Sequence, residues 1–167
     1  MRIALAVAVS LLTVIPSCGT AVDSAPAQPV SELADSYWSQ TQLDGARTVA
    51  DVRATSTDGE SLVVNGRVKD FIPGHAVFTL VDASVDSCRE LEGDACKTPW
   101  DYCCTDATLL ADNTITVEVR DESGQPLPTT VKGFHGIDHL DTVAVHGDVS
   151  RDEHGNVTIA MAAIHGP

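Results

Sequence analysis

Alternating apolar and polar residues dominate the chain from residue 61 onward. The alternating runs are short, rich in β-branched residues and half polar, which is typical of strands that bury one face. They cover residues 61–69, 76–82, 114–120, 142–149 and 157–164. Residues 70–74 and 151–155 contain glycine with proline or charged side chains, and both segments predict hairpin turns. The pattern therefore predicts an all-β domain of five strands.

Helix is predicted shortly before the first strand. Residues 49–54 form a short candidate helix, in which Thr48 is the N-cap and Asp51 reaches back to it. Residues 31–40 are a second, weaker candidate. We therefore expect one short N-terminal helix beside the strands.

The first 18 residues have the pattern of an export signal. Arg2 precedes an almost unbroken apolar run over residues 3–15, which suits a signal peptide and is too short to span a bilayer comfortably. Residues 15–18 (Ile-Pro-Ser-Cys) resemble a bacterial lipobox, although Pro16 replaces the usual small residue. The resemblance implies cleavage after residue 17 and a lipid on Cys18. Ordinary cleavage that leaves Cys18 as a thiol is the alternative.

The rest of the chain divides into a tether and one domain. Residues 18–30 are rich in Ala, Pro and Ser without a period and predict a flexible tether. Residues 31–167 have the length of a single domain. We expect an exported protein, anchored to the cell envelope by its lipid on the periplasmic side of a membrane.

The charge of the chain restricts its partners. The sequence has 10 basic and 24 acidic side chains, for a formal net charge of −14. Removing residues 1–17 deletes one basic side chain and no acidic one, which leaves −15. Such a field repels phosphate backbones and anionic lipid, so we expect no nucleic-acid partner. The expected partner is an envelope protein or ligand, with membrane contact only through the anchor.

Two segments resemble the hairpins of a bacterial OB-fold domain of the anticodon-binding-like or small exported type. Residues 62–82 are similar to the first hairpin, with Gly66 in the bend of its long first strand, and residues 142–164 are similar to the closing hairpin, with Gly147 in the matching bend. The resemblance implies a five-stranded Greek-key barrel, in which glycine permits sharp coiling. Many OB domains bind oligonucleotides, but here the second and third strands carry Phe78 and no row of stacking aromatics.

Four of the five cysteines lie between the second and third predicted strands, at Cys88, Cys96, Cys103 and Cys104. Zinc sites usually take pairs of ligands separated by a few residues, and neighbours in an extended chain point to opposite sides. In an oxidising compartment an even number of cysteines in a long loop indicates disulfides. We therefore expect two bridges and no metal or other cofactor, with Cys88 and Cys96 each paired to one of the adjacent cysteines. Each bridge would close a loop of about 9 to 17 residues and contribute about 3 kcal/mol.

A metal-binding or thiol-redox module that uses the same four cysteines is the alternative. The segment TPWDYCC also resembles a group of uncharacterised bacterial lipoproteins, which implies no known activity. Its Trp100 and Tyr102 either pack over the bridges or form a recognition surface, and with Phe78 they are the candidate binding surface.

The histidines give a weaker signal. His135 and His139 with Asp138 are conceivable metal ligands, but Gly133 and Gly136 predict a loop in which polar side chains face water. We find no nucleophile–base pair, P-loop, HExxH or CxxC motif and therefore expect no enzyme. The sequence predicts a binding or structural module of the cell envelope; a nucleic-acid-binding OB domain is the second alternative, which the acidic charge disfavours.

Overall fold

The computed structural model describes residues 32–93, 96–98 and 100–167. The predicted signal peptide, the lipidated Cys18 and nearly all of the tether lie outside these residues. The described elements are η1 (Asp35–Tyr37), β1 (Arg47–Thr48), α1 (Val49–Thr55), β2 (Ser61–Phe71), β3 (Val77–Val81), η2 (Cys88–Glu90), α2 (Ala107–Asp112), β4 (Thr114–Glu118), η3 (Phe134–Gly136), β5 (Thr142–Arg151) and β6 (Val157–His165). Within the described residues no helix is both long and apolar enough to cross a membrane.

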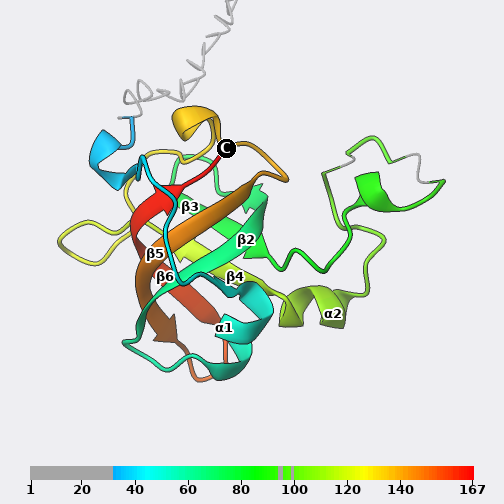
Figure 1. Cartoon of the computed structure of the whole chain (residues 1–167), viewed down its shortest axis with the longest axis horizontal. Coiled ribbons are helices and arrows are strands. Elements are labelled where there is room, and N and C mark those ends of the chain that lie inside the picture. Colours follow the sequence, from blue (N-terminus) through cyan, green and yellow to red (C-terminus); the bar gives the residue numbers. More distant parts are fainter. Residues whose placement is uncertain (1–31, 94–95, 99) are drawn as a thin grey trace, which may run out of the picture.

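Five of the strands close into a barrel (Figure 1). The order is β2-β3-β4-β6-β5, and β5 pairs again with β2 to complete the circle. The pairs are antiparallel except β4 with β6, which run parallel. This order confirms the prediction of an all-β, OB-like barrel of five strands. Strand β1, which the sequence pattern did not predict, adds a short parallel edge to β2.

The period-2 alternation places one side of each strand inside the barrel. In β2 the side chains of Leu62, Val64 and Val68 are buried, and the same register recurs in the other strands. Gly66 and Gly147 lie where neighbouring elements approach most closely. A Cβ on Gly147 would lie 2.3 Å from the carbonyl oxygen of Ala160, so the glycine predicted at this bend is required by packing.

Helix α1 begins as predicted and lies against the barrel. The Thr48 hydroxyl accepts the Asp51 N–H at 3.2 Å, which is the predicted N-cap. The Asp51 carboxylate does not reach back; it binds Arg47 at 2.6 Å. In the described part of the second helix candidate, residues 32–40, the helical structure is the single 3-10 turn η1.

The segment between β3 and β4 extends to one side of the barrel (Figure 1). It carries η2, the cysteines and α2, and α2 was not predicted. The segment is held by a small second core of Val81, Val85 and Tyr102, apart from the main barrel core. We call it the insertion (residues 82–113).

Candidate functional site

Three sulfur atoms meet in the insertion. The Sγ atoms of Cys88, Cys96 and Cys103 all lie within 4.8 Å of one another. The Sγ of Cys103 is 3.5 Å from that of Cys88 and 3.7 Å from that of Cys96. We call these three residues the thiol trio. Among the described residues it is the group of Cys, His, Asp and Glu side chains that is compact enough to hold one metal ion.

These spacings can be compared with two kinds of sulfur chemistry. A disulfide has a bond of about 2.05 Å, well below either distance. A metal ion bound by thiolates at about 2.3 Å in tetrahedral geometry holds its sulfur atoms about 3.8 Å apart. Two of the three Sγ–Sγ distances in the trio, 3.5 and 3.7 Å, are thus close to the spacing in a thiolate metal site.

The adjacent cysteines lie in a turn and not in an extended strand. This geometry brings the Sγ atoms of Cys103 and Cys104 to 4.0 Å, whereas an extended chain would direct them to opposite sides. Cys103 is bonded to none of its three sulfur neighbours, so the predicted staple of two bridges is not formed in this structure. The chain is therefore not extended at these neighbours as the prediction assumed, although Cys104 is not among the sulfur atoms that lie within 4.8 Å of one another.

An ion pair connects the barrel to η2, the segment that carries Cys88, which we call the first arm of the trio. Ser87 and Glu90 form a capping box around η2, in which the Glu90 carboxylate accepts both the N–H and the hydroxyl of Ser87 at 2.8 Å. The same carboxylate binds Arg67 of β2 at 2.5 Å. Burial acts to raise the pKa of Glu90, but these hydrogen bonds outweigh it and lower the pKa. Cys88, the first residue of η2, is thereby held above β2.

Tyr102 anchors the turn that carries Cys103, which we call the second arm of the trio. Its side chain is 1% exposed, and it places Cys103 directly beside the second core. Burial raises the pKa of Tyr102, while the nearby Arg67 charge acts in the opposite direction. The hydroxyl makes no hydrogen bond of acceptable geometry with the described residues, even though Arg67 is close to it. One barrel residue, Arg67, is thus next to the anchors of both arms.

The thiols of the trio differ in acidity. Hydrogen bonds from the Thr98 hydroxyl and backbone lower the pKa of Cys96. Contacts with the sulfurs of Cys88, Cys96 and Cys104 raise the pKa of Cys103 to about 12. Binding of a thiophilic ion would require these thiols to lose their protons.

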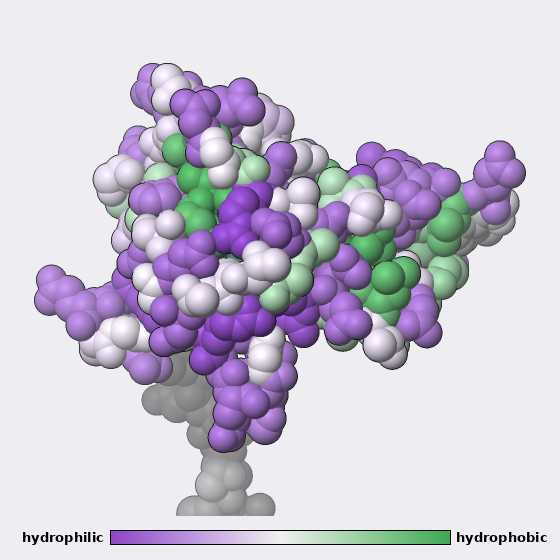
Figure 2. Space-filling view, turned by 60° about the horizontal axis from the view of Figure 1, so that its bottom comes forward, coloured by the Kyte–Doolittle hydropathy of each residue, from purple (hydrophilic) through white to green (hydrophobic). Residues whose placement is uncertain are grey.

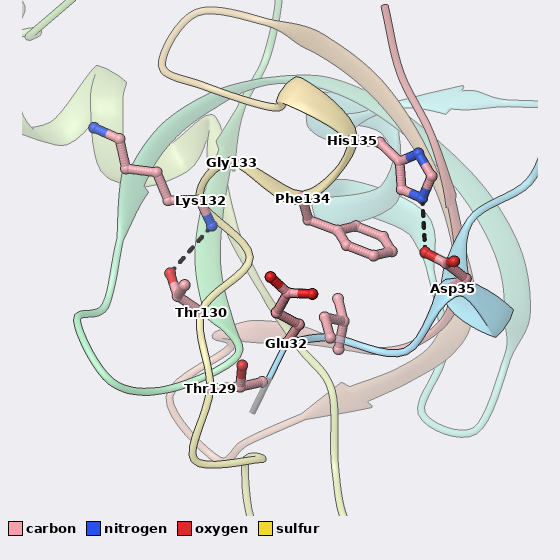
Figure 3. Close-up of a pocket in the computed structure, with 9 residues that line it drawn as sticks. Glu32, Asp35, Thr129, Thr130, Lys132, Gly133, Phe134 and His135 are labelled. Atoms are coloured by element: carbon pink, nitrogen blue, oxygen red, sulfur yellow. Dashed lines mark hydrogen bonds and ion pairs between the residues drawn. The ribbon is translucent and has the colours of Figure 1, made fainter. Parts of the chain in front are cut away.

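A cavity of about 430 Å³ lies elsewhere, between the N-terminal segment and the loop before β5 (Figure 3). The Glu32 carboxylate points into it between Thr130 and Phe134, and the Lys132 amine points away (Figure 3). His135 binds the Asp35 carboxylate at 3.1 Å. This contact uses the Nε2 atom of the imidazole.

The structure separates the histidines that the sequence suggested as metal ligands. His135 stacks on Trp38 with ring centroids 4.3 Å apart. His139 bonds the carbonyl oxygen of Lys69 through Nδ1 at 2.7 Å, and Asp138 pairs with Lys132 at 3.2 Å. Each side chain has its own structural contact, so they do not converge on one ion.

The candidate binding surface needs correction. Phe78 is 0% exposed inside the barrel and Tyr102 is buried in the second core, so neither contributes to a surface. Trp100 is 38% exposed and stacks on His139 at 5.7 Å, which connects the insertion to the barrel. The lobe beside the barrel in Figure 2 shows hydrophobic patches among its polar groups. Leu109 of α2, 50% exposed, is also a large exposed apolar side chain of the insertion.

Sequence reasoning missed the contacts that position the trio. Arg67 falls on a polar position of the strand predicted over residues 61–69, and the sequence pattern does not single out Glu90. The two residues are 23 positions apart, and no periodic signal connects them. The sequence signal that could have found the capping box was Ser87 followed three residues later by Glu90.

No family model matches the sequence, and no curated protein sequence matches it. Among solved structures, the chain is similar to the hypothetical protein ygiW from E. coli, with 18% identity over 74% of this chain and 90% of that one, at a TM-score of 0.41. It aligns with a protein from Leishmania major Friedlin described as an aspartyl-tRNA synthetase, with 11% identity over 77% of this chain and 22% of that one, at 0.42. It also aligns with the OBody AM1L10 bound to hen egg-white lysozyme, with 15% identity over 76% of this chain and 97% of that one, at 0.41. At these scores the alignments carry no argument of their own, and the fold assignment depends on the strand order.

Proposed function

We propose that the chain is an exported lipoprotein of the cell envelope that binds one thiophilic metal ion through the thiol trio. The single observation that carries the metal site is the convergence of three Sγ atoms within 4.8 Å. The export signal and the lipid anchor on Cys18 are supported by the sequence pattern of residues 1–18.

The chemistry of the ligands limits the choice of ion. Three thiolates are soft ligands, which favour Zn²⁺ or Cu⁺ over Mg²⁺ and Ca²⁺. Three thiolates also carry a charge of −3 once deprotonated, so binding of a cation neutralises a concentration of negative charge in an acidic protein.

The test is metal analysis of purified, reduced residues 31–167 after exposure to Zn²⁺ and, separately, to Cu⁺ under argon. We expect one ion per chain and loss of three titratable thiols on loading. Substituting Co²⁺ should give the intense near-ultraviolet absorption of thiolate-to-metal charge transfer. Loading below a tenth of an equivalent with all thiols still titratable would overturn the metal site.

The second candidate is the stapled binding module that the sequence predicted. It is favoured by the 3.5 Å contact between the Sγ atoms of Cys88 and Cys103, which a small side-chain rotation could convert into a bond. In that case the exposed Trp100 and the rest of the insertion would contact an envelope protein or ligand. Mass spectrometry of protein isolated from the envelope in the presence of an alkylating agent separates the two candidates, because each bridge removes two hydrogens and blocks two alkylation sites.

The anchor is tested independently of the metal. We expect metabolic labelling with an alkyne fatty acid to mark the wild-type chain, and Cys18→Ser to abolish the label. An unlabelled wild-type chain in the soluble envelope fraction would contradict lipidation and leave the metal site standing.

A further inference from the structure

Cys104 lies at the edge of the thiol trio without belonging to it. Its Sγ is 4.0 Å from that of Cys103, but it is not among the atoms that all lie within 4.8 Å of one another. The three ligands also differ in depth, since Cys88 is 2% exposed, Cys96 is half-buried and Cys103 is exposed. The candidate site is therefore closed on the Cys88 side and open on the side of the adjacent cysteines.

An open side has a functional meaning for a metal ion. Structural zinc sites are closed by four protein ligands, and sites that exchange or react keep a position for an incoming ligand. Among the described residues, three side chains surround the position of the ion, and the next sulfur, Cys104, faces solvent. The described chain thus supplies three ligands and one exposed thiol at the opening.

We propose that the trio is a transfer site for a thiophilic ion, and that Cys104 is the exit ligand through which the ion passes to an acceptor that offers thiolate or imidazole groups. This inference rests on the proposed metal binding and gives that binding a purpose. The ion moves outward by exchange of one ligand at a time, and Cys88 and Cys96 are the last ligands to be released.

The exchange is balanced without a redox partner. The Cys104 thiol loses a proton to solvent and its thiolate binds the ion. The bond from the ion to Cys103 breaks, and the Cys103 sulfur takes up a proton. The acceptor's ligands then replace Cys104, Cys96 and Cys88 one after another, and each released sulfur takes up a proton as its bond to the ion breaks. No electron is transferred, and the oxidation state of the ion is unchanged.

The anchor of each arm agrees with this division of roles. Cys88 is fixed through η2 and the Glu90–Arg67 pair, and the trio's open side is formed by the turn that follows Tyr102. The segment with Cys88 would hold the ion, while the exposed turn with Cys103 and Cys104 makes the ion accessible to the acceptor.

The experiment compares the two adjacent cysteines by the same substitution. Reduced residues 31–167 are loaded with Zn²⁺, and the Kd is measured by competition with a fluorescent zinc chelator. Transfer is then followed in a stopped-flow instrument with rising concentrations of 4-(2-pyridylazo)resorcinol, whose zinc complex is coloured. For the wild type we expect the rate to rise linearly with dye concentration, because the incoming ligand enters the open side.

Cys103→Ser should raise the Kd by about 100-fold, because it removes one of three ligands. Cys104→Ser should leave the Kd within about 3-fold of wild type and slow the transfer by about 10-fold. A Cys104→Ser variant with the Kd of Cys103→Ser would overturn the proposal, because Cys104 would then be a fourth ligand of a closed structural site. A wild-type rate that is independent of dye concentration would overturn it too, and in both cases the metal-binding function would stand. Failure of the wild type to bind Zn²⁺ would overturn both.

Discussion

Arg67 offers the sharpest test of how the barrel supports the thiol trio. The perturbation is Arg67→Met, which keeps the aliphatic stem of the side chain and removes its guanidinium. The substitution deletes the 2.5 Å ion pair with Glu90 and leaves the capping box of η2 without its connection to β2. The variant would therefore lose this connection between the barrel and η2, the element that carries Cys88.

The magnitude follows from the exposure of the pair. A hydrogen bond between charged groups contributes about 1.5–3 kcal/mol when it is shielded. The side chains are 15% exposed for Arg67 and 39% exposed for Glu90, so solvent screening reduces the figure to about 1–2 kcal/mol. If the ion must supply this ordering energy, the affinity for Zn²⁺ should fall by about 5- to 30-fold, since about 1.4 kcal/mol corresponds to tenfold.

The assay is a competition titration of Zn²⁺ with reduced protein, and Arg151→Met is the matched control. Arg151 is also half-buried, and its guanidinium donates to the carbonyl oxygens of Arg53 and Ser56 at 2.7 and 3.0 Å, away from the insertion. We expect the control to lower the thermal midpoint and leave the affinity for Zn²⁺ unchanged. The reasoning would be refuted by an unchanged affinity in Arg67→Met, or by an equal loss in both variants.

Three further predictions concern stability. Gly147→Ala should destabilise the barrel by about 3 kcal/mol or more, measured by urea unfolding, because its Cβ would overlap the Ala160 carbonyl; Gly155→Ala, at a positive φ with open space, should cost only about 1–2 kcal/mol. Tyr102→Phe should change the free energy of unfolding by less than about 1 kcal/mol, since the lost hydroxyl has no well-formed hydrogen bond, and a larger loss would show that the Arg67 contact matters. Burial acts to raise the pKa of Asp82, but hydrogen bonds from Ala50 and Ser84 outweigh burial and lower the pKa below 3.8. The Asp82 carboxylate therefore stabilises the fold above pH 3.8, and this stabilisation is lost as the pH falls through the folded-state pKa. Asp82→Asn should therefore lower stability at pH 7 and reduce its decline in acid, which chemical denaturation across pH 2–7 measures.

The barrel could be predicted because its cause is local. Alternation in each strand records which face is buried, and Thr48 marks the start of α1 by its own hydrogen bond. Strand β1 was not predicted, because two residues are too few to show a period. Helix α2 was not predicted, because six residues with no buried side chain leave no amphipathic pattern. Its N-cap was the available signal, since the Asp106 carboxylate accepts hydrogen bonds from two backbone N–H groups.

The candidate site could be predicted only in part, because its geometry depends on contacts between distant segments. The four cysteines were visible as a group, but their spacing in sequence said nothing about a turn at Cys103 that brings neighbouring sulfurs to one side. Phe78 alternates like its neighbours, and only the closed barrel shows that its face is the interior. The pairing of His135 with Asp35 joins residues 100 positions apart and has no sequence signature.

The predicted disulfides and the proposed metal site use the same atoms, so the two states exclude each other. A bridge between Cys88 and Cys103 would remove two of the three sulfurs within 4.8 Å and leave Cys96 as a single thiolate, which cannot hold the ion alone. Conversely, a bound ion fixes the sulfurs about 3.8 Å apart and blocks bond formation. Loading with Zn²⁺ should therefore protect the cysteines from oxidation, and oxidation should release the ion. Arg67 and Tyr102 position both arms in the disulfide state and in the metal-bound state, so the barrel supports the cysteines in either state.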